Sequence, residues 1–289
     1  MKRFIVRLSM FLAVVLIAVA LFTLLLLHPR NRLIALGDDV YGVFLGNSTV
    51  ECGINDLMIP GTFNFARSAE RIEYVYAKLK ILKKYNPSIN TAFVQFDDII
   101  IGHTSAKTPH SHPIFIDAFS LRDIANNIKT FSFDRNAAYI CHTYDVKNIR
   151  YLISANFREV NISQMQIGGY RYLIRDKLAE NIEILEKDSD KQTTPPLKFP
   201  MSNLYYYKAI VEFCQKNEIK LYFITTPRHP IYWRDSSYKH LKIEYFPDIP
   251  MIDYSHMQLP DSCFGDGVHL NYIGARIFSD SLATVIEGL

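Results

Sequence analysis

The sequence predicts a mixed α/β protein in which helices cover both faces of a five-stranded parallel sheet. Five short runs rich in Val, Ile, Phe and Tyr are typical of buried strands, and helical patterns lie between several of them. Strands that alternate with helices favour a parallel sheet, so we expect a three-layer α/β/α arrangement. The five expected strands are residues 40–45, 62–66, 91–96, 220–225 and 250–254.

The expected helices follow from apolar residues at helical spacing. In residues 68–84, Ile72, Val75 and Leu79 share one face, and Ser68 is the expected N-cap. The long interval between the third and fourth strands is expected to hold a helical insertion at about 100–200. The other expected helices are one that opens with a capping box at Ser120 and Asp123, and residues 136–154, 171–187, 203–216 and 272–286.

The composition excludes two broad classes of protein. The chain has 289 residues, which fits one large domain or two small ones, and 49% of them are apolar, so it is not largely disordered. Residues 1–32 hold five of the 32 Lys and Arg and none of the 29 Asp and Glu, so residues 33–289 carry a net charge of −2. A body without excess positive charge argues against a nucleic acid as partner.

Residues 10–27 (MFLAVVLIAVALFTLLLL) form an apolar stretch that is long enough to cross a bilayer. A buried core helix would show a polar face, which this stretch lacks. A cleaved signal peptide would end in small residues, whereas this stretch ends in LLLLHPR. We therefore expect residues 1–32 to be an uncleaved signal-anchor in the membrane, with a cleaved signal peptide as the alternative, and residues 33–289 to form the folded domain.

Basic residues indicate the orientation of this span. Lys2, Arg3 and Arg7 precede it, and Arg30 and Arg32 follow it. The bias favours the N-terminus inside and the domain outside the cytoplasm, where disulfides are possible. The sequence leaves open how four scattered cysteines pair: Cys52, Cys141, Cys214 and Cys263.

Polar residues follow several of the expected strands, at the sheet edge where parallel α/β proteins bind ligands. Ser48 comes after the first strand, behind Gly46, and a serine needs a base to act as a nucleophile. His269 is the expected base, and Asp266 is expected to orient its imidazole ring. The backbone N–H of Ser48, at a helix N-terminus, is an expected donor to an oxyanion.

The motifs around these residues resemble those of the SGNH (GDSL-like) hydrolase superfamily. FLGNST at 44–49 is similar to the nucleophile block, and DGVHLNYIGA at 266–275 is similar to the block that carries the base. ECGIND (51–56), NFARS (64–68) and TTPRHP (225–230) look like stretches of membrane-anchored SGNH-like proteins of bacterial envelope and polysaccharide loci. The resemblance spans roughly residues 40–285 and covers 100–200 poorly.

The resemblance implies a flavodoxin-like sheet and a Ser48–His269–Asp266 triad. The implied function is that of a membrane-anchored serine esterase or O-acyltransferase that acts on acyl esters of an envelope or extracellular glycan. No cofactor is required for this chemistry. The implied location is the cytoplasmic (inner) membrane, crossed once, with the domain on the extracytoplasmic side. The oligomeric state is left open.

The sequence departs from the family pattern in two respects, the residue before the serine and the oxyanion hole. Asn47 stands where the family has an aspartate before the serine. The family's oxyanion hole adds a glycine after the second strand and an asparagine after the third, whereas this chain has Arg67 in the first place and Asp97 with Asp98 in the second. A backbone N–H near Arg67 is the expected replacement for the glycine, but an ionised carboxylate repels an oxyanion.

Three outcomes are open for this oxyanion site. Burial keeps a carboxyl protonated, or another donor such as Arg228 or His229 replaces it, or activity is weak or lost. The last outcome gives the alternative function, a catalytically inactive SGNH-like module that binds a glycan or a partner protein in envelope assembly. His110 and His112 form a His-x-His pattern without an acidic residue close in sequence, so we expect no metal site.

Overall fold

A computed structural model of the chain describes residues 2–27, 34–102, 150, 153–154, 168–188, 199–232 and 237–289. Most of the predicted insertion at 100–200 lies outside these residues. The same holds for the predicted capping box at Ser120, for the His-x-His pattern at His110, and for Cys141.

The core of the fold is a five-stranded sheet, and all of its strand pairs are parallel. The strand order is β2-β1-β3-β4-β5. The chain adds β2 on one side of β1 and then crosses to the other side of β1 to add β3, so the order in which strands are added reverses between β1 and β3. Every strand lies within a predicted run, which confirms the predicted parallel α/β class. The strands are β1 (Gly42–Leu45), β2 (Thr62–Asn64), β3 (Thr91–Gln95), β4 (Lys220–Thr225) and β5 (Met251–Asp253).

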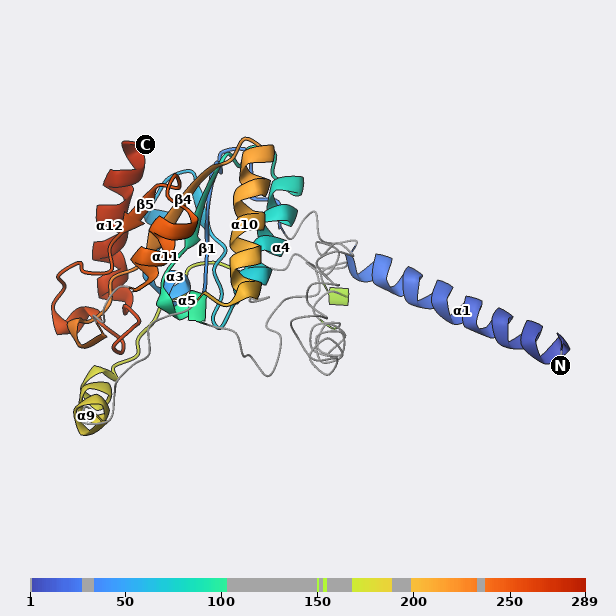
Figure 1. Ribbon diagram of the computed structural model, residues 1–289, viewed down its shortest axis with the longest axis horizontal. Helices are drawn as coiled ribbons and strands as arrows, with labels where there is room; N and C mark the ends of the chain where they lie inside the picture. The colour runs from blue at the N-terminus through green and yellow to red at the C-terminus, as the bar shows by residue number, and fades with distance from the viewer. Residues whose placement is uncertain are drawn as a thin grey trace.

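Helices pack on both faces of this sheet, because successive side chains of a strand point to opposite faces. Val43 and Val94 contribute to the core under α4 (Ile72–Tyr85) and α10 (Met201–Lys216). Phe44 and Phe93 stack on each other in the second core, under α3 (Ser48–Gly53) and α12 (Tyr272–Glu287). Figure 1 shows α12 on one side of the sheet and α10 with α4 on the other.

The remaining described elements are short, apart from the first. Helix α1 (Lys2–Leu27) is apolar, and its stretch Arg3–Phe22 is long enough to cross a membrane and is not buried within the described protein. It therefore does not act as a core helix. The other elements are α5 (Asp98–Gly102), α9 (Leu178–Asp188), α11 (Ser237–Tyr245), η1 (Asp56–Met58), η4 (Pro230–Tyr232) and η5 (Asp261–Cys263).

Two helix predictions were wrong in part. Helix α4 begins at Ile72 rather than near Ser68, because Ala69 has a φ of 58° and the Ser68 hydroxyl donates to Glu51 instead of capping the helix. Residues 171–177 are not helical, and α9 begins at Leu178. The backbone N–H groups of Arg171 and Lys177 and the carbonyl of Leu173 bond to other segments instead of to a helical turn.

The packing of α10 predicts a large difference between two isoleucines. Ile210 on α10 is fully buried, whereas Ile243 on α11 is 67% exposed. Ile210→Ala should lower the free energy of unfolding by about 2–5 kcal/mol, because it leaves a cavity in the core. The matched Ile243→Ala should change it by less than about 0.5 kcal/mol. Urea denaturation of the full chain in mild detergent measures both, and equal losses would contradict the described core.

Candidate active site

The turn that carries Ser48 lies directly after β1. Asn47 caps α3, and its side-chain oxygen accepts hydrogen bonds from the backbone N–H of Thr49 at 3.1 Å and from its hydroxyl at 3.2 Å. Ser48 is the first residue of α3 and is half-buried. A side chain at Gly46 would meet the Gln95 amide oxygen at 2.5 Å, so glycine is needed here for close packing.

The side chain of Gln95, the last residue of β3, forms hydrogen bonds with this turn. Its buried side-chain oxygen accepts the backbone N–H of Asn47 at 2.7 Å. Its side-chain nitrogen donates to the Thr49 hydroxyl at 3.0 Å and to the Asp97 carboxylate at 2.8 Å. This role of Gln95 was not among the predictions, although a polar amide at the end of an apolar strand is a visible signal for it.

The loop that carries His269 is closed by an antiparallel bridge between Phe264 and Leu270. Within it, one carboxylate oxygen of Asp266 accepts the backbone N–H groups of Val268 and His269 at 3.0 and 2.9 Å. The imidazole Nδ1 of His269 lies 2.9 Å from both oxygens of the same carboxylate. These bonds fix the ring so that Nε2 points out of the loop.

The structure brings Ser48, His269 and Asp266 together. The Ser48 hydroxyl oxygen lies 2.8 Å from Nε2 of His269, although the two residues are 221 positions apart in sequence. The contact predicted from the motifs is therefore present. With Nδ1 donating to Asp266, Nε2 accepts from the serine hydroxyl, which is the arrangement that removes a proton from a nucleophile.

Asp266 is held as an anion. Burial of its carboxyl favours the neutral form, but hydrogen bonds from His269, the Val268 backbone and Arg175 outweigh burial and lower its pKa below the ordinary value. Arg175 donates to the second carboxylate oxygen at 2.5 Å. Arg175 was not among the predicted site residues, because its segment was predicted to be a helix.

The oxyanion side of the site contains one of the expected donors. The backbone N–H of Ser48 makes no hydrogen bond to another residue of the described ranges, so it can donate to a ligand. The expected donor near Arg67 is not the N–H of Arg67 itself, because that group donates to the Gly46 carbonyl at 3.1 Å. It holds the ends of β1 and β2 together instead.

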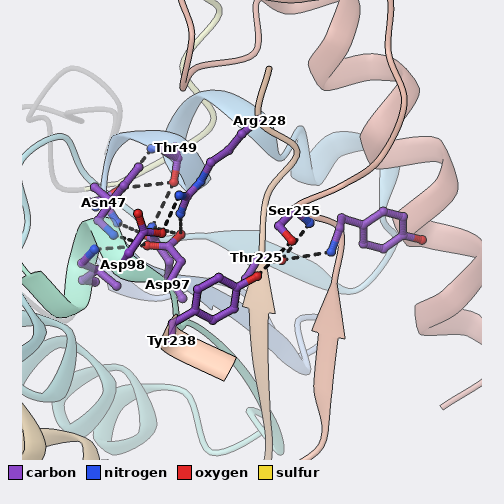
Figure 2. A network of polar contacts seen from close by, with 12 residues as sticks. Asn47, Thr49, Asp97, Asp98, Thr225, Arg228, Tyr238 and Ser255 are labelled. Carbon is purple, nitrogen blue, oxygen red and sulfur yellow. Dashed lines mark hydrogen bonds and ion pairs between the residues drawn. The ribbon is translucent and has the colours of Figure 1, made fainter. Parts of the chain in front are cut away.

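Arg228 pairs with both acidic residues beyond β3. Its guanidinium lies 3.0 Å from the Asp97 carboxylate and 2.5 Å from the Asp98 carboxylate (Figure 2). Burial disfavours the charged arginine, but the two carboxylates outweigh burial and raise its pKa. Asp97 also accepts the backbone N–H groups of Ile99 and Ile100, so its oxygens face donors and it cannot itself donate to an oxyanion.

His229 supports the loop of His269 from the side. Its backbone N–H donates to the Gly267 carbonyl at 3.2 Å, and its ring packs edge-on against Phe264. Its Nε2 lies 3.1 Å from Asp261. These contacts place both His229 and Arg228 beside the site, and their role in binding a substrate or an oxyanion stays a prediction.

A second polar network lies at the ends of β4 and β5 (Figure 2). The Thr225 hydroxyl donates to Asp253 at 2.7 Å, and Lys239 pairs with the same carboxylate at 2.7 Å. The hydroxyl of Tyr238 donates to Ser255 at 2.9 Å. Burial favours neutral Asp253, but these hydrogen bonds outweigh burial and lower its pKa.

An extended segment, residues 168–177, connects the two halves of the site, and we call it the strap. Its backbone makes four hydrogen bonds of 2.6 to 3.0 Å to other segments. The partners are the carbonyl of Asn64 at the end of β2, the carbonyl of Glu51 in α3, the N–H of Tyr272 in α12 and the carbonyl of Gly265. The strap thus joins the segment of Ser48 to the loop of His269.

The described residues offer little for a metal or a redox role. They contain no group of three His, Cys, Asp or Glu side chains placed to bind a metal ion. Cys52, Cys214 and Cys263 are buried and form no disulfide with one another. Burial raises the pKa of Cys52 to about 12, so its thiol stays protonated beside the site.

Comparison with known proteins gives one family match, and its description names no function. One protein-family model, which carries no descriptive name, matches residues 125–289, more than half of the chain. The chain belongs to that family. No curated protein matched the chain, and no solved structure matched it. The geometry of the site is therefore what bears on function.

Gly274 in α12 is required for the approach of this helix to the loop of His269. A Cβ atom at Gly274 would lie 2.2 Å from the backbone carbonyl oxygen of Cys263. Gly274→Ala should lower the free energy of unfolding by about 1–3 kcal/mol, because the backbone must shift. Gly288→Ala is the matched control, since its nearest neighbour is an ordinary 3.5 Å away. Equal urea midpoints for the two variants would contradict this packing.

The network around Asp253 predicts a pH-dependent loss of stability. A carboxylate with a lowered pKa stabilises the folded state above its unfolded pKa of about 4, and the contribution is lost as the pH falls further. Asp253→Asn should therefore destabilise the protein at pH 7, and the difference from wild type should shrink below pH 4. Asp280→Asn, at an exposed position on α12, is the control. Urea titrations at several pH values test this, and a pH-independent difference would refute it.

Proposed function

We propose that this chain is a serine esterase or O-acyltransferase in which Ser48 is the nucleophile, His269 the base and Asp266 the orienting acid. The observation that carries the proposal is the 2.8 Å separation between the Ser48 hydroxyl and Nε2 of His269, with Asp266 bonded to Nδ1. The hydroxyl is half-buried at the carboxyl edge of the sheet, where ligands of open α/β proteins bind.

The chemistry follows from these positions. The Ser48 oxygen attacks the carbonyl carbon of an ester, and its proton passes to Nε2 of His269. The carbonyl oxygen becomes an oxyanion, to which the backbone N–H of Ser48 donates. When the intermediate collapses, the ester C–O bond breaks, and His269 returns the proton to the departing alkoxide. A water molecule or a sugar hydroxyl then attacks the acyl-serine by the same route.

The proposal places the chain among the SGNH-like hydrolases. The strand order is the flavodoxin-like 2-1-3-4-5, and the two motifs that carry the resemblance, at 44–49 and 266–275, hold the residues that meet. Fold alone does not decide function, so the support comes from the site.

We further propose that residues 1–32 anchor the enzyme in the cytoplasmic membrane and that residues 33–289 form the domain on its extracytoplasmic side. The apolar helix α1 and the basic residues before it support this arrangement. A tethered enzyme with this resemblance fits an acyl ester of an envelope or extracellular glycan as substrate.

A second candidate is a catalytically inactive SGNH-like module that binds a glycan or a partner protein. One observation favours it: the position of an expected oxyanion donor holds Asp97, which is paired with Arg228 and cannot donate. Loss of one such donor costs other serine hydrolases about 10²–10³ in rate. A protein that lacks this donor would keep its fold but lose most of its catalytic turnover.

A fluorophosphonate probe, which reacts covalently with activated serines, separates the two candidates. Wild-type full chain in detergent should be labelled, and Ser48→Ala should abolish the labelling because it removes the nucleophile. Ser202→Ala, on α10 at the opposite face of the sheet, should be labelled like wild type. A folded wild-type protein that stays unlabelled at high probe concentration would overturn the enzyme in favour of the binding module.

A further inference from the structure

The carboxylate of Asp266 is shared between two chain segments. One oxygen accepts the backbone N–H groups of Val268 and His269 within its own loop. The other oxygen accepts from Arg175 at 2.5 Å, and both lie 2.9 Å from Nδ1 of His269. The orientation of the carboxylate toward the imidazole is therefore set from the loop on one side and from the strap on the other.

The strap packs closely against the loop of His269 through backbone contacts. A side chain at Gly265 would meet Leu173 at 2.9 Å and the carbonyl oxygen of Arg175 at 3.2 Å, so the two backbones pack closely. The N–H of Lys177 donates to the Gly265 carbonyl at 2.8 Å. Arg175 lies between these contacts, which fixes its backbone opposite Asp266.

We propose that Arg175 is a positioning residue of the site, which acts on His269 through Asp266. This inference rests on the proposed function, because it assigns a role within the same proton-transfer chain. Asp266 is 9% exposed in its side chain and Arg175 is 40% exposed, so solvent screens the pair in part but does not separate it. The guanidinium does not reach the reacting atoms and is not a catalytic residue.

The charges decide in which direction loss of Arg175 changes the protonation of the His269 ring. A carboxylate beside an imidazole stabilises the protonated ring, and a guanidinium on that carboxylate withdraws part of this stabilisation. Without Arg175, imidazolium would persist to higher pH, so less neutral base would be available at a given pH. The carboxylate would also lose the donor that holds its second oxygen.

Other charged and titratable groups surround this chain of contacts and stay unchanged in the test. They are Glu51 and Cys52 of α3, Arg171 and Lys177 of the strap, His229 with Asp261 beside the loop, and Tyr232 of η4, whose ring packs against Gly267.

Two substitutions of Arg175 and one control test the inference on the full chain in detergent. In Arg175→Gln, the pH midpoint of fluorophosphonate labelling should rise by about 0.5–1 pH unit, and the rate near pH 6 should fall roughly threefold to tenfold. Arg175→Lys keeps the positive charge and should recover most of the rate. Lys177→Gln removes the same charge two residues away, where the side chain pairs with Glu180, and should match wild type.

A second measurement does not require activity. An NMR pH titration of the His269 ring, assigned with a His269→Gln variant, should show the same upward shift of its midpoint in Arg175→Gln. If wild type is labelled and Arg175→Gln shows an unchanged midpoint in both measurements, the inference is overturned while the proposed function stands. If wild type is not labelled but the ring midpoint rises, the proposed function fails and the coupling of Arg175 to His269 stands.

Discussion

The site depends on a constraint of parallel sheets, which bring the carboxyl ends of all their strands to one edge. Ser48 follows β1 at that edge, next to the central strand β3, and the loop of His269 reaches it because α12 packs against α3. Close backbone approach makes this possible at two places, Gly46 against Gln95 and Gly274 against Cys263. The hydrogen bond between Ser48 and His269 is the result of this packing.

A buried ion pair, Lys78 with Glu70, lies near the same edge of the sheet. Lys78 of α4 reaches under the loop after β2, where it donates to the Phe65 carbonyl at 2.7 Å and to Glu70 at 2.8 Å. Burial raises the pKa of Glu70 to about 7, against the pull of Lys78. Loss of one partner from such a buried pair leaves an uncompensated charge, so these pairs hold the edge in one arrangement.

The ion pair of Asp97 with Arg228 lies at the same edge as the Ser48–His269 contact. It is coupled to the serine turn through Gln95, which bonds both to Asp97 and to the backbone of Asn47. The structure thus keeps a serine–histidine contact beside a buried acid–arginine pair, at the position where the resemblance implies an oxyanion donor. That combination is why both an enzyme and a binding module follow from one site.

The sequence by itself determined the five strands, the apolar N-terminal helix and the residues that meet at the site, because strand runs and turn motifs are local patterns. Only the tertiary structure decided the rest. A backbone N–H near Arg67 was predicted as an oxyanion donor, but the N–H of Arg67 itself donates to the Gly46 carbonyl, and residues 171–177 were predicted as helix but form part of the strap. Their hydrogen-bond partners lie far away in sequence, and no local pattern of residues encodes which distant carbonyl an N–H will meet.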